Sequence, residues 1–323
     1  MPAAAAAAND AIVVEDLVRT YPGGLRAVDG INLEVAEGEI YGFLGPNGAG
    51  KSTAVRMLTT LLRPTSGRAL VAGFDVVKDA ASVRRNIGVA LQEAALDPLM
   101  TGRELLELQG ALHGIPRAAA RARGADLLGR VELEDAAERR LATYSGGMRR
   151  RLDLAMALVH EPRVLFLDEP TTGLDPASRS ALWREVRLLN DEGTTVFLTT
   201  QYLEEAEQLA DRVGIIDHGR IVAEGTPDEL KAKIGQPALH VQIVDEARLD
   251  EARQLLAPLG ACSDHAEHGV MLRTSEGARA IAPVVRLLDE AGIEVQTVEV
   301  EQPSLDDVFL AVTGHPAEEA QPA

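Results

Sequence analysis

A glycine-rich loop at residues 45–53 constrains the fold more than any other stretch of this 323-residue chain. It follows the apolar residues 40–44 and precedes a segment in which apolar residues recur at helical spacing. The loop has the pattern G-x-x-x-x-G-K-[ST], in which glycines let successive backbone N–H groups face the phosphates of a nucleotide. The N-terminus of the following helix adds a favourable dipole. We therefore predict a phosphate-binding loop that consists of Gly45, Pro46, Asn47, Gly48, Ala49, Gly50, Lys51, Ser52 and Thr53.

Two side chains of this loop would act directly on a bound nucleotide. The ammonium of Lys51 would reach the β- and γ-phosphate oxygens, and the hydroxyl of Ser52 would be offered to Mg²⁺. The alternative is a glycine turn with a purely structural role. Because a strand-like run precedes the loop and a helical pattern follows it, the sequence favours a nucleotide site.

A pair of carboxylates, Asp168 and Glu169, ends a second apolar run at residues 164–167. Asp168 could hold Mg²⁺ through water or through the hydroxyl of Ser52, and Glu169 could orient or deprotonate the water that attacks the nucleotide. An acidic pair that only caps a helix is the alternative. The phosphate loop upstream favours the catalytic interpretation.

A third feature is the segment Ser145, Gly146 and Gly147, which begins a helical pattern that is first arginine-rich and then apolar. A serine hydroxyl, free backbone N–H groups and the helix dipole together make an anion-binding surface. By itself such a segment is more often a simple helix cap. Its position after a phosphate loop and before a strand that ends in Asp-Glu makes it informative.

The composition narrows the possible partners and the compartment. Fifty acidic against 32 basic residues give a net charge of −18, which would repel a nucleic-acid backbone, so no nucleic-acid partner is expected. The single cysteine, Cys262, argues against a disulfide framework and fits a cytoplasmic chain. No apolar stretch approaches the roughly 20 residues of a membrane-crossing helix, so a membrane role requires a partner.

Apolar patterning divides the chain into two domains flanked by short tails. The fully apolar run at 164–167 and the strand-like run at 195–199 alternate with helical patterns, which predicts a parallel sheet covered on both faces. An antiparallel pair of strands is expected at 12–18 and 27–35. We expect disordered tails at 1–10 and 315–323, a nucleotide-binding domain at 11–236 with a helical insert at about 92–160, and an accessory α+β domain at 237–314.

The accessory domain alternates strands and helices in a way that could form a small sandwich of ferredoxin-like type. It carries no catalytic constellation. His265 and His268 could serve as metal ligands, but the polar, turn-like residues around them favour a solvated hairpin loop.

Together these motifs resemble those of the ATP-binding subunit of an ABC transporter over residues 12–235. The similarity implies an α/β fold, the P-loop NTPase cassette, with a mixed sheet core, an antiparallel β subdomain, a helical subdomain, and ATP and Mg²⁺ as cofactors. In the family's terms the chain contains a Walker A loop at 45–53, a Q-loop residue at Gln92, a signature at 145–147, a Walker B strand at 164–169 and a D-loop at 173–175.

The resemblance also implies roles for individual residues. Tyr21 lies where the family stacks an aromatic ring on adenine. Besides residues 45–53, the nucleotide-binding set includes Tyr21 and Gln92, and the Mg²⁺ ligands would be Ser52, Gln92 and Asp168. Contacts to the nucleotide of a partner chain would come from Ser145, Gly146, Gly147 and Asp175, and the catalytic residues would be Glu169, Gln201 and Lys51.

Two departures from the family pattern concern the signature and the switch residue. Tyr144 and Met148 replace the usual leucine and glutamine of the signature, but its anion-binding centre is intact. Gln201 stands where the family has a histidine. Because a glutamine amide can donate to a γ-phosphate oxygen but cannot exchange a proton near neutral pH, Glu169 becomes the main candidate for the base.

Residues 198–206 and 144–148 are most similar to the daunorubicin/doxorubicin-resistance exporter family. That resemblance implies an ATP-hydrolysing chain at the cytoplasmic face of the membrane, which powers a separate multi-span permease that exports an amphipathic drug or secondary metabolite. It also implies a homodimer in which each ATP lies between the Walker A loop of one chain and the signature of the other. The family links its C-terminal extension to dimer or permease contacts.

The alternative is a soluble ABC-type ATPase that acts without a permease, either as a regulatory subunit or on ribosomes or nucleic acid. The chain has one phosphate loop and no long coiled-coil insert, and its acidic charge disfavours nucleic acid. The carboxylate of Glu169 disfavours a non-hydrolysing regulator. The transporter interpretation is therefore preferred.

Overall fold

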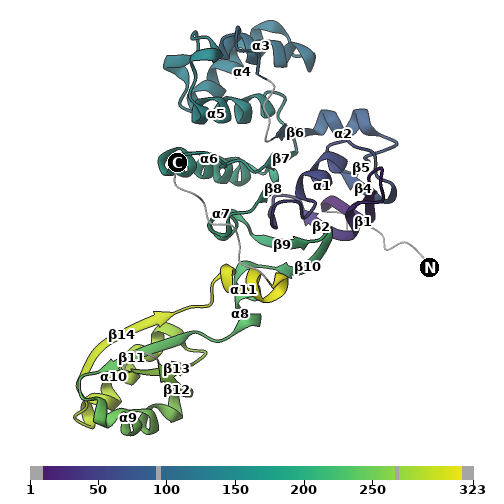
Figure 1. The fold of residues 1–323 in the computed structure, drawn as a ribbon. Coiled ribbons are helices and arrows are strands. Elements are labelled where there is room, and N and C mark those ends of the chain that lie inside the picture. The colour runs from purple at the N-terminus through teal and green to yellow at the C-terminus, as the bar shows by residue number, and fades with distance from the viewer. Residues whose placement is uncertain (1–9, 92–95, 266–268, 315–323) are drawn as a thin grey trace. The chain divides into compact units, whose positions relative to one another are not determined.

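The computed structural model describes residues 10–91, 96–265 and 269–314. The described residues form two compact units, 10–227 and 228–314 (Figure 1). The division lies one helix before the expected boundary at 236, because nearly all of helix α8 (Pro227–Ile234) groups with the second unit.

A six-stranded sheet with the order β10-β9-β3-β8-β7-β6 forms the centre of the larger unit. Five of its strands run parallel, and β10 (Arg220–Gly225) pairs antiparallel with β9 at one edge. Strands β3, β7 and β8 are buried along their full length, which confirms the parallel sheet predicted from fully apolar runs. The parallel strands are β3 (Ile40–Leu44), β6 (Ile87–Ala90), β7 (Val164–Asp168), β8 (Thr195–Thr200) and β9 (Arg212–Asp217).

An antiparallel sheet with the order β2-β1-β4-β5 forms a second layer of this unit. Its strands β1 (Asp10–Thr20) and β2 (Arg26–Ala36) contain the predicted antiparallel pair. One hydrophobic cluster joins this sheet to helix α1 and to the central sheet through residues that include Leu17, Val55 and Phe43. The other elements of this region are helix α1 (Lys51–Leu58), β4 (Ser66–Val71), β5 (Phe74–Asp75) and helix α2 (Ala80–Asn86).

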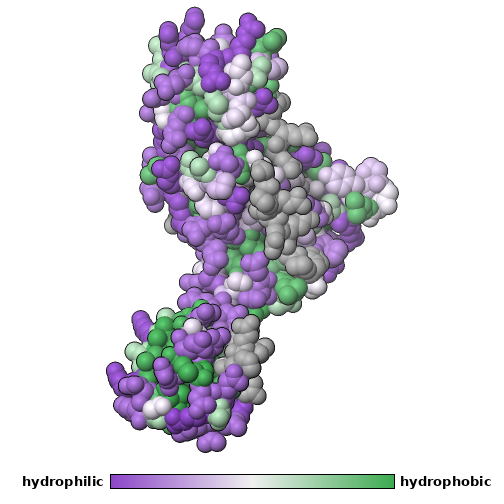
Figure 2. All heavy atoms as spheres, turned by 60° about the vertical axis from the view of Figure 1, so that its left-hand side comes forward, coloured by the Kyte–Doolittle hydropathy of each residue, from purple (hydrophilic) through white to green (hydrophobic). Residues whose placement is uncertain are grey.

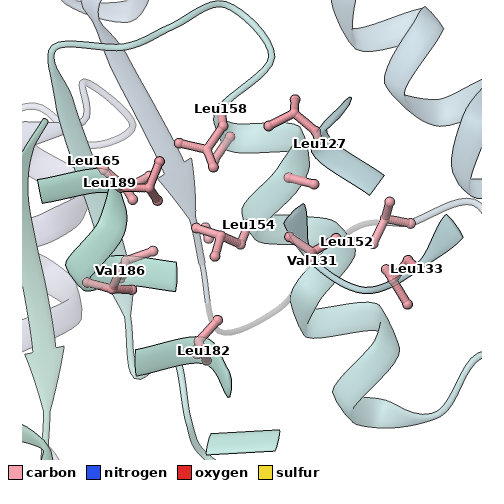
Figure 3. Close-up of a cluster of buried hydrophobic side chains, with 14 of the residues drawn as sticks. Leu127, Val131, Leu133, Leu152, Leu154, Leu158, Leu165, Leu182, Val186 and Leu189 are labelled. Carbon is pink, nitrogen blue, oxygen red and sulfur yellow. The ribbon is translucent and has the colours of Figure 1, made fainter. Parts of the chain in front are cut away.

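The insert between β6 and β7 is helical, as predicted. Its last helix shares a core with the central sheet, because Leu154 and Leu158 pack in one cluster with Leu165 of β7 and Val186 of α6 (Figure 3). This packing fixes the start of that helix relative to the end of β7. The helices of the insert are α3 (Gly102–Leu112), α4 (Arg117–Arg130) and α5 (Gly146–Ala157), and those that follow β7 and β8 are α6 (Pro176–Asp191) and α7 (Leu203–Leu209).

The smaller unit is a ferredoxin-like α+β sandwich, as the sequence predicts. Its antiparallel sheet has the order β12-β13-β11-β14, and the chain runs strand, helix, strand, strand, helix, strand. Alternate residues of β11, such as Leu239 and Val241, enter a core that α9 and α10 cover. The elements are β11 (Ala238–Ile243), α9 (Leu249–Leu256), β12 (Ala261–His265), β13 (Gly269–Arg273), α10 (Ile281–Glu290), β14 (Val295–Glu301) and α11 (Leu305–Thr313).

Strand β12 is an element that the sequence pattern did not predict. The residues up to His265 pair antiparallel with β13 at the edge of the sheet, where a loop was expected. An edge strand can keep polar residues, so it lacks the apolar alternation that would reveal it. His268 lies outside the described residues. Among the described residues, no three histidine, cysteine or acidic side chains gather as a metal site.

Across the ranges that the structure describes, no helix combines the length and the apolar character needed to cross a bilayer. On the face shown in Figure 2, hydrophilic residues dominate the surface of the larger unit, whereas hydrophobic residues gather on the smaller unit.

Asp153 is a buried carboxylate on the inner face of α5. Its Oδ2 atom has no hydrogen-bond partner within the described residues, and the nearest cation is Arg150, with 3.5 Å between Nη1 and Oδ2. Burial raises the pKa of Asp153 from its ordinary 3.8 to about 6, although Arg150 opposes the shift. Between these two values the folded chain binds the proton more tightly than the unfolded chain, so the free energy of unfolding falls as the pH rises.

We expect the free energy of unfolding of the Asp153→Asn variant to increase, relative to that of the wild type, as the pH rises. The amide carries no charge, so the variant avoids the cost that the wild type acquires between pH 5 and pH 7.5, which is about 1–2 kcal/mol. Urea unfolding followed by circular dichroism at the two pH values measures the difference. Asp191→Asn, the same substitution at an exposed position, is the control. A pH-independent difference for Asp153→Asn would contradict the prediction.

Candidate functional site

Two glycines of the phosphate loop are required by the backbone geometry. The loop leaves β3 at Leu44, and a Cβ on Gly45 would lie 2.4 Å from the carbonyl oxygen of Ile216. Gly50 has a φ of +113°, and a Cβ there would lie 2.2 Å from the carbonyl oxygen of Ala27. Both positions therefore exclude any larger residue, which explains the spacing of the motif in physical terms.

Helix α1 begins without a side-chain cap, unlike α3, α5 and α6 of this unit. Its N-cap is Gly50, which offers no side-chain hydrogen bond, and its first turn holds no acidic residue. By contrast, Ser145 caps α5 and Asp175 caps α6. The first-turn N–H groups of α1 are left for another acceptor, and the positive end of the helix favours an anion such as phosphate.

The side chain of Lys51 lies inside the loop and is only 4% exposed. Its Nζ donates to the carbonyl oxygens of Gly45 at 2.6 Å and Pro46 at 3.1 Å. The same ammonium lies 3.3 Å from Oε1 of Glu169, whose side chain is also buried. The ammonium of Lys51 thus connects the phosphate loop to the carboxylate that follows β7.

Asp168 meets the loop through the hydroxyl of Ser52, which donates to Oδ1 at 3.2 Å. The hydroxyl of Thr199 donates to the same oxygen at 2.5 Å. A serine hydroxyl and a carboxylate are hard oxygen ligands, and Mg²⁺ is commonly held by one or two such groups together with phosphates. Ser52 and Asp168 therefore fit the predicted magnesium site.

Thr199 is a site residue that the sequence analysis did not identify. It pairs directly with Asp168 across the parallel strands β7 and β8. Its hydroxyl accepts the N–H of Glu169 at 3.1 Å, and its carbonyl oxygen accepts the same N–H at 3.1 Å. The available signal was its position at the end of an apolar strand next to the strand that ends in Asp-Glu.

Glu169 has a backbone conformation that few non-glycine residues adopt. Its φ is +47°, in the left-handed region, at the first position after β7. One carboxylate oxygen faces Lys51, and the other accepts from the hydroxyl of Thr172 at 3.5 Å. A buried carboxylate beside a phosphate loop has the chemistry of a base that accepts a proton from water.

Of the remaining predicted site residues, the structure describes Tyr21, which follows β1, and Gln201, which follows β8. The hydroxyl of Tyr21 is 3.4 Å from Oγ1 of Thr53, and the guanidinium of Arg19 stacks over the Tyr21 ring, 4.9 Å from its centroid. Gln201 follows β8, and its side-chain oxygen is buried without a hydrogen-bond partner among the described residues. Gln92 lies outside the described residues.

The signature and D-loop residues form the starts of two neighbouring helices. The hydroxyl of Ser145 accepts the N–H of Met148 at 3.2 Å, and Gly146 and Gly147 form the first turn of α5. Asp175 caps α6 and accepts two hydrogen bonds from Ser178, which lower the pKa of its carboxyl. A Cβ on Gly147 would lie 3.0 Å from Oγ of Ser178, so the two helix starts adjoin.

Comparisons with known proteins agree with this geometry. The ABC transporter family profile matches residues 28–172, and the profile of the C-terminal domain of DrrA1-3-like ATP-binding proteins matches residues 225–313. The chain is 50% identical over 307 residues to the daunorubicin resistance ATP-binding protein DrrA3 of Streptomyces coeruleorubidus, over 95% of this chain and 97% of that protein. It is 45% identical over 317 residues to the doxorubicin resistance ATP-binding protein DrrA of Mycobacterium tuberculosis, over 95% of both chains.

A solved structure supports the same assignment of the fold. The structure is described as a dimeric, post-hydrolysis state of the ATP-binding cassette MJ0796 bound to ADP and Pi. Its TM-score is 0.62 at 28% identity, over 67% of this chain and 98% of that one. Neither this structure nor the relatives support the alternative of a soluble ATPase that acts without a permease.

We expect Lys51→Ala to lower the affinity for ATP at least about tenfold, because a charge-assisted hydrogen bond to phosphate contributes about 1.5–3 kcal/mol. Calorimetric titration of the purified chain with ATP measures the change. Lys78→Ala, at a lysine side chain that is 81% exposed, is the control and should bind ATP like the wild type. Unchanged affinity in Lys51→Ala would contradict the phosphate-loop assignment.

Proposed function

The chain belongs to the ATP-binding proteins of the ABC transporter family, and from this premise we propose that it hydrolyses ATP to power a separate permease that exports an amphipathic drug or secondary metabolite. The proposal rests on one observation: two residues of the phosphate loop contact the two carboxylates at the end of β7, Lys51 with Glu169 and Ser52 with Asp168. Transfer of a phosphoryl group to water requires phosphate binding, Mg²⁺ binding and a base, and these four groups have the chemistry for those roles.

The chemistry follows from the position of each group. The loop amides and Lys51 would bind the β- and γ-phosphates, and Glu169 would take the proton of the attacking water. The amide of Gln201 would donate to a γ-phosphate oxygen. Ser52 and Asp168, with Gln92, would hold Mg²⁺, which neutralises charge on the phosphates. Tyr21 would stack on the adenine at the edge of the site.

We further propose a homodimer in which the signature completes the site of the partner chain. Ser145, Gly146 and Gly147 present a helix N-terminus, and Asp175 lies at the adjoining helix start. The MJ0796 cassette, which is similar in fold, is described as dimeric. ATP would favour the closed dimer by binding both chains, and loss of the γ-phosphate would favour the open state.

The permease would dock in a groove between the sheet and the helical insert. This groove has a volume of about 420 Å³ and is lined by Leu61, Val89 and Leu91 on the sheet side and by His113, Met156 and His160 on the insert side. The two histidine rings stack with their centroids 3.8 Å apart, and burial lowers the pKa of both, so they present a neutral wall. Arg84 and Asp153 also line the groove, so its apolar residues would contact one side of an amphipathic segment.

The proposed location is the cytoplasmic face of the membrane, with the accessory domain of residues 237–314 as a further contact. The drug-export assignment rests on relatives named for daunorubicin and doxorubicin resistance. Contacts with the exported molecule would be made by the permease, so its identity is not determined by the residues of this chain.

We expect Glu169→Gln to lower the ATPase rate by about 10²–10⁴-fold, the usual contribution of a positioned base, while ATP affinity stays within about threefold. The amide keeps the shape of the carboxylate but cannot accept the proton. Phosphate release and ATP titration measure the two quantities on the same protein. Wild-type turnover in the variant would exclude Glu169 as the base.

Leu61→Asp tests the docking groove. The side chain of Leu61 is 60% exposed, so a charge there should leave the fold and ATP binding unchanged but should weaken attachment to the permease. The readout is the fraction of chain bound to host membranes, with protein-free liposomes of the same lipids as the background. Leu188→Asp, 52% exposed on α6, is the matched control. Equal membrane binding by both variants and the wild type would contradict the proposed groove.

A further inference from the structure

Arg150 makes contacts that none of the motifs described above requires. Its guanidinium is largely buried and donates to three backbone carbonyl oxygens: Nε to Pro170 at 2.9 Å, Nη2 to Asp168 at 2.7 Å and Nη1 to Leu91 at 2.5 Å. These carbonyls belong to two different parts of the sheet, since Leu91 follows β6 and the other two flank the end of β7. The guanidinium of arginine carries its donors on three separate nitrogens in a rigid fork, which suits three acceptors from separate parts of the chain.

Two of the three acceptors lie on either side of Glu169. Asp168 precedes it and Pro170 follows it, so one guanidinium holds the backbone at both neighbours of this residue. The left-handed φ of +47° at Glu169 is a conformation that costs of the order of 1 kcal/mol and persists only when the surroundings impose it. Thr199 restrains the N–H of Glu169, and Arg150 restrains the carbonyls around it.

From this geometry we propose that Arg150 is a positioning residue that holds Glu169 in its catalytic orientation and links it to the signature helix. The proposal rests on the proposed function, because it assigns Arg150 a role through the base of ATP hydrolysis. The three hydrogen bonds of the Arg150 guanidinium all go to backbone carbonyl oxygens. Arg150 acts through the backbone on which Glu169 is carried.

The link to the signature comes from the position of Arg150 on α5. The same helix begins with Ser145, Gly146 and Gly147, which would contact the nucleotide of the partner chain. Gly146, Arg150 and Glu169 also line one cavity of about 240 Å³. A shift of α5 would therefore move the carbonyls that flank Glu169. The base of one site would respond to the state of the signature that serves the other site.

The test replaces Arg150 with lysine, which keeps the charge but cannot bridge the carbonyls of two strands. We expect Arg150→Lys to lower kcat for ATP hydrolysis at least about tenfold, as small misplacements of a catalytic group do, while ATP affinity stays within about threefold. Thermal unfolding of the same preparations reports the folded fraction. Arg150→Gln, a shorter neutral side chain, repeats the measurement if the lysine variant does not fold.

Arg151→Lys is the matched control, because Arg151 is the next residue of α5 and its guanidinium also donates a hydrogen bond to a carbonyl oxygen. Nη1 of Arg151 donates to the carbonyl oxygen of Val131 at 2.9 Å, within the insert. We expect this variant to keep the wild-type kcat. A fall in kcat that is equal in the two variants, or an unchanged kcat in Arg150→Lys, would overturn the proposal.

Parallel losses of kcat, ATP affinity and folded fraction in the Arg150 variants would also overturn it, since they would indicate a structural role only. Failure of the proposed function gives a different result. A wild-type chain that neither binds nor hydrolyses ATP would contradict that function and this inference together. A wild-type chain that hydrolyses ATP while the Arg150 variants do so equally well would contradict this inference alone.

Discussion

The parallel pairing of β3, β8 and β7 is the constraint on which the site depends. Parallel strands end at the same edge, so the loop after Leu44 and the carboxylates after Leu167 meet without any long connection. The register places Asp168 opposite Thr199. A slip by one residue would turn the fully apolar strands over and separate this pair. Because both faces of these strands are buried, their polarity does not set the register, and the hydrogen bonds of Thr199 with Asp168 and Glu169 help to define it.

The site concentrates charges that would be costly to bury singly. Lys51, Asp168 and Glu169 are each less than a tenth exposed. The ammonium is satisfied by loop carbonyls and by Glu169, and Asp168 accepts from two hydroxyls. Mutual pairing of this kind offsets the loss of hydration, and removal of any one member would leave its partners unsatisfied. The cluster is therefore a unit in which substitutions are expected to be non-additive.

The sequence predicted much of this organisation, for identifiable reasons. The phosphate loop, the parallel strands and the helical insert follow from glycine spacing and from the length of apolar runs. Thr199 was not found, because a threonine in an apolar strand looks like any β-branched residue until its strand neighbour is known. Strand β12 was not found, because an edge strand need not alternate. Arg150 belongs to a run of three arginines, but it lies three and four residues before Asp153 and Leu154, and this spacing marks it as the inward-facing member.

Helix α6 carries the only tryptophan in the chain, Trp183, and its indole Nε1 donates to Oε1 of Glu205 at 3.2 Å. Glu205 is fully buried on α7, four residues after Gln201, and burial raises the pKa of its carboxyl. The indole is thereby attached to the segment that would respond to the γ-phosphate. Since indole emission is sensitive to a neighbouring carboxyl group, this hydrogen bond would give the protein an intrinsic optical reporter on the helix that follows Gln201. The intervals between binding, hydrolysis and release could then be timed without an attached dye.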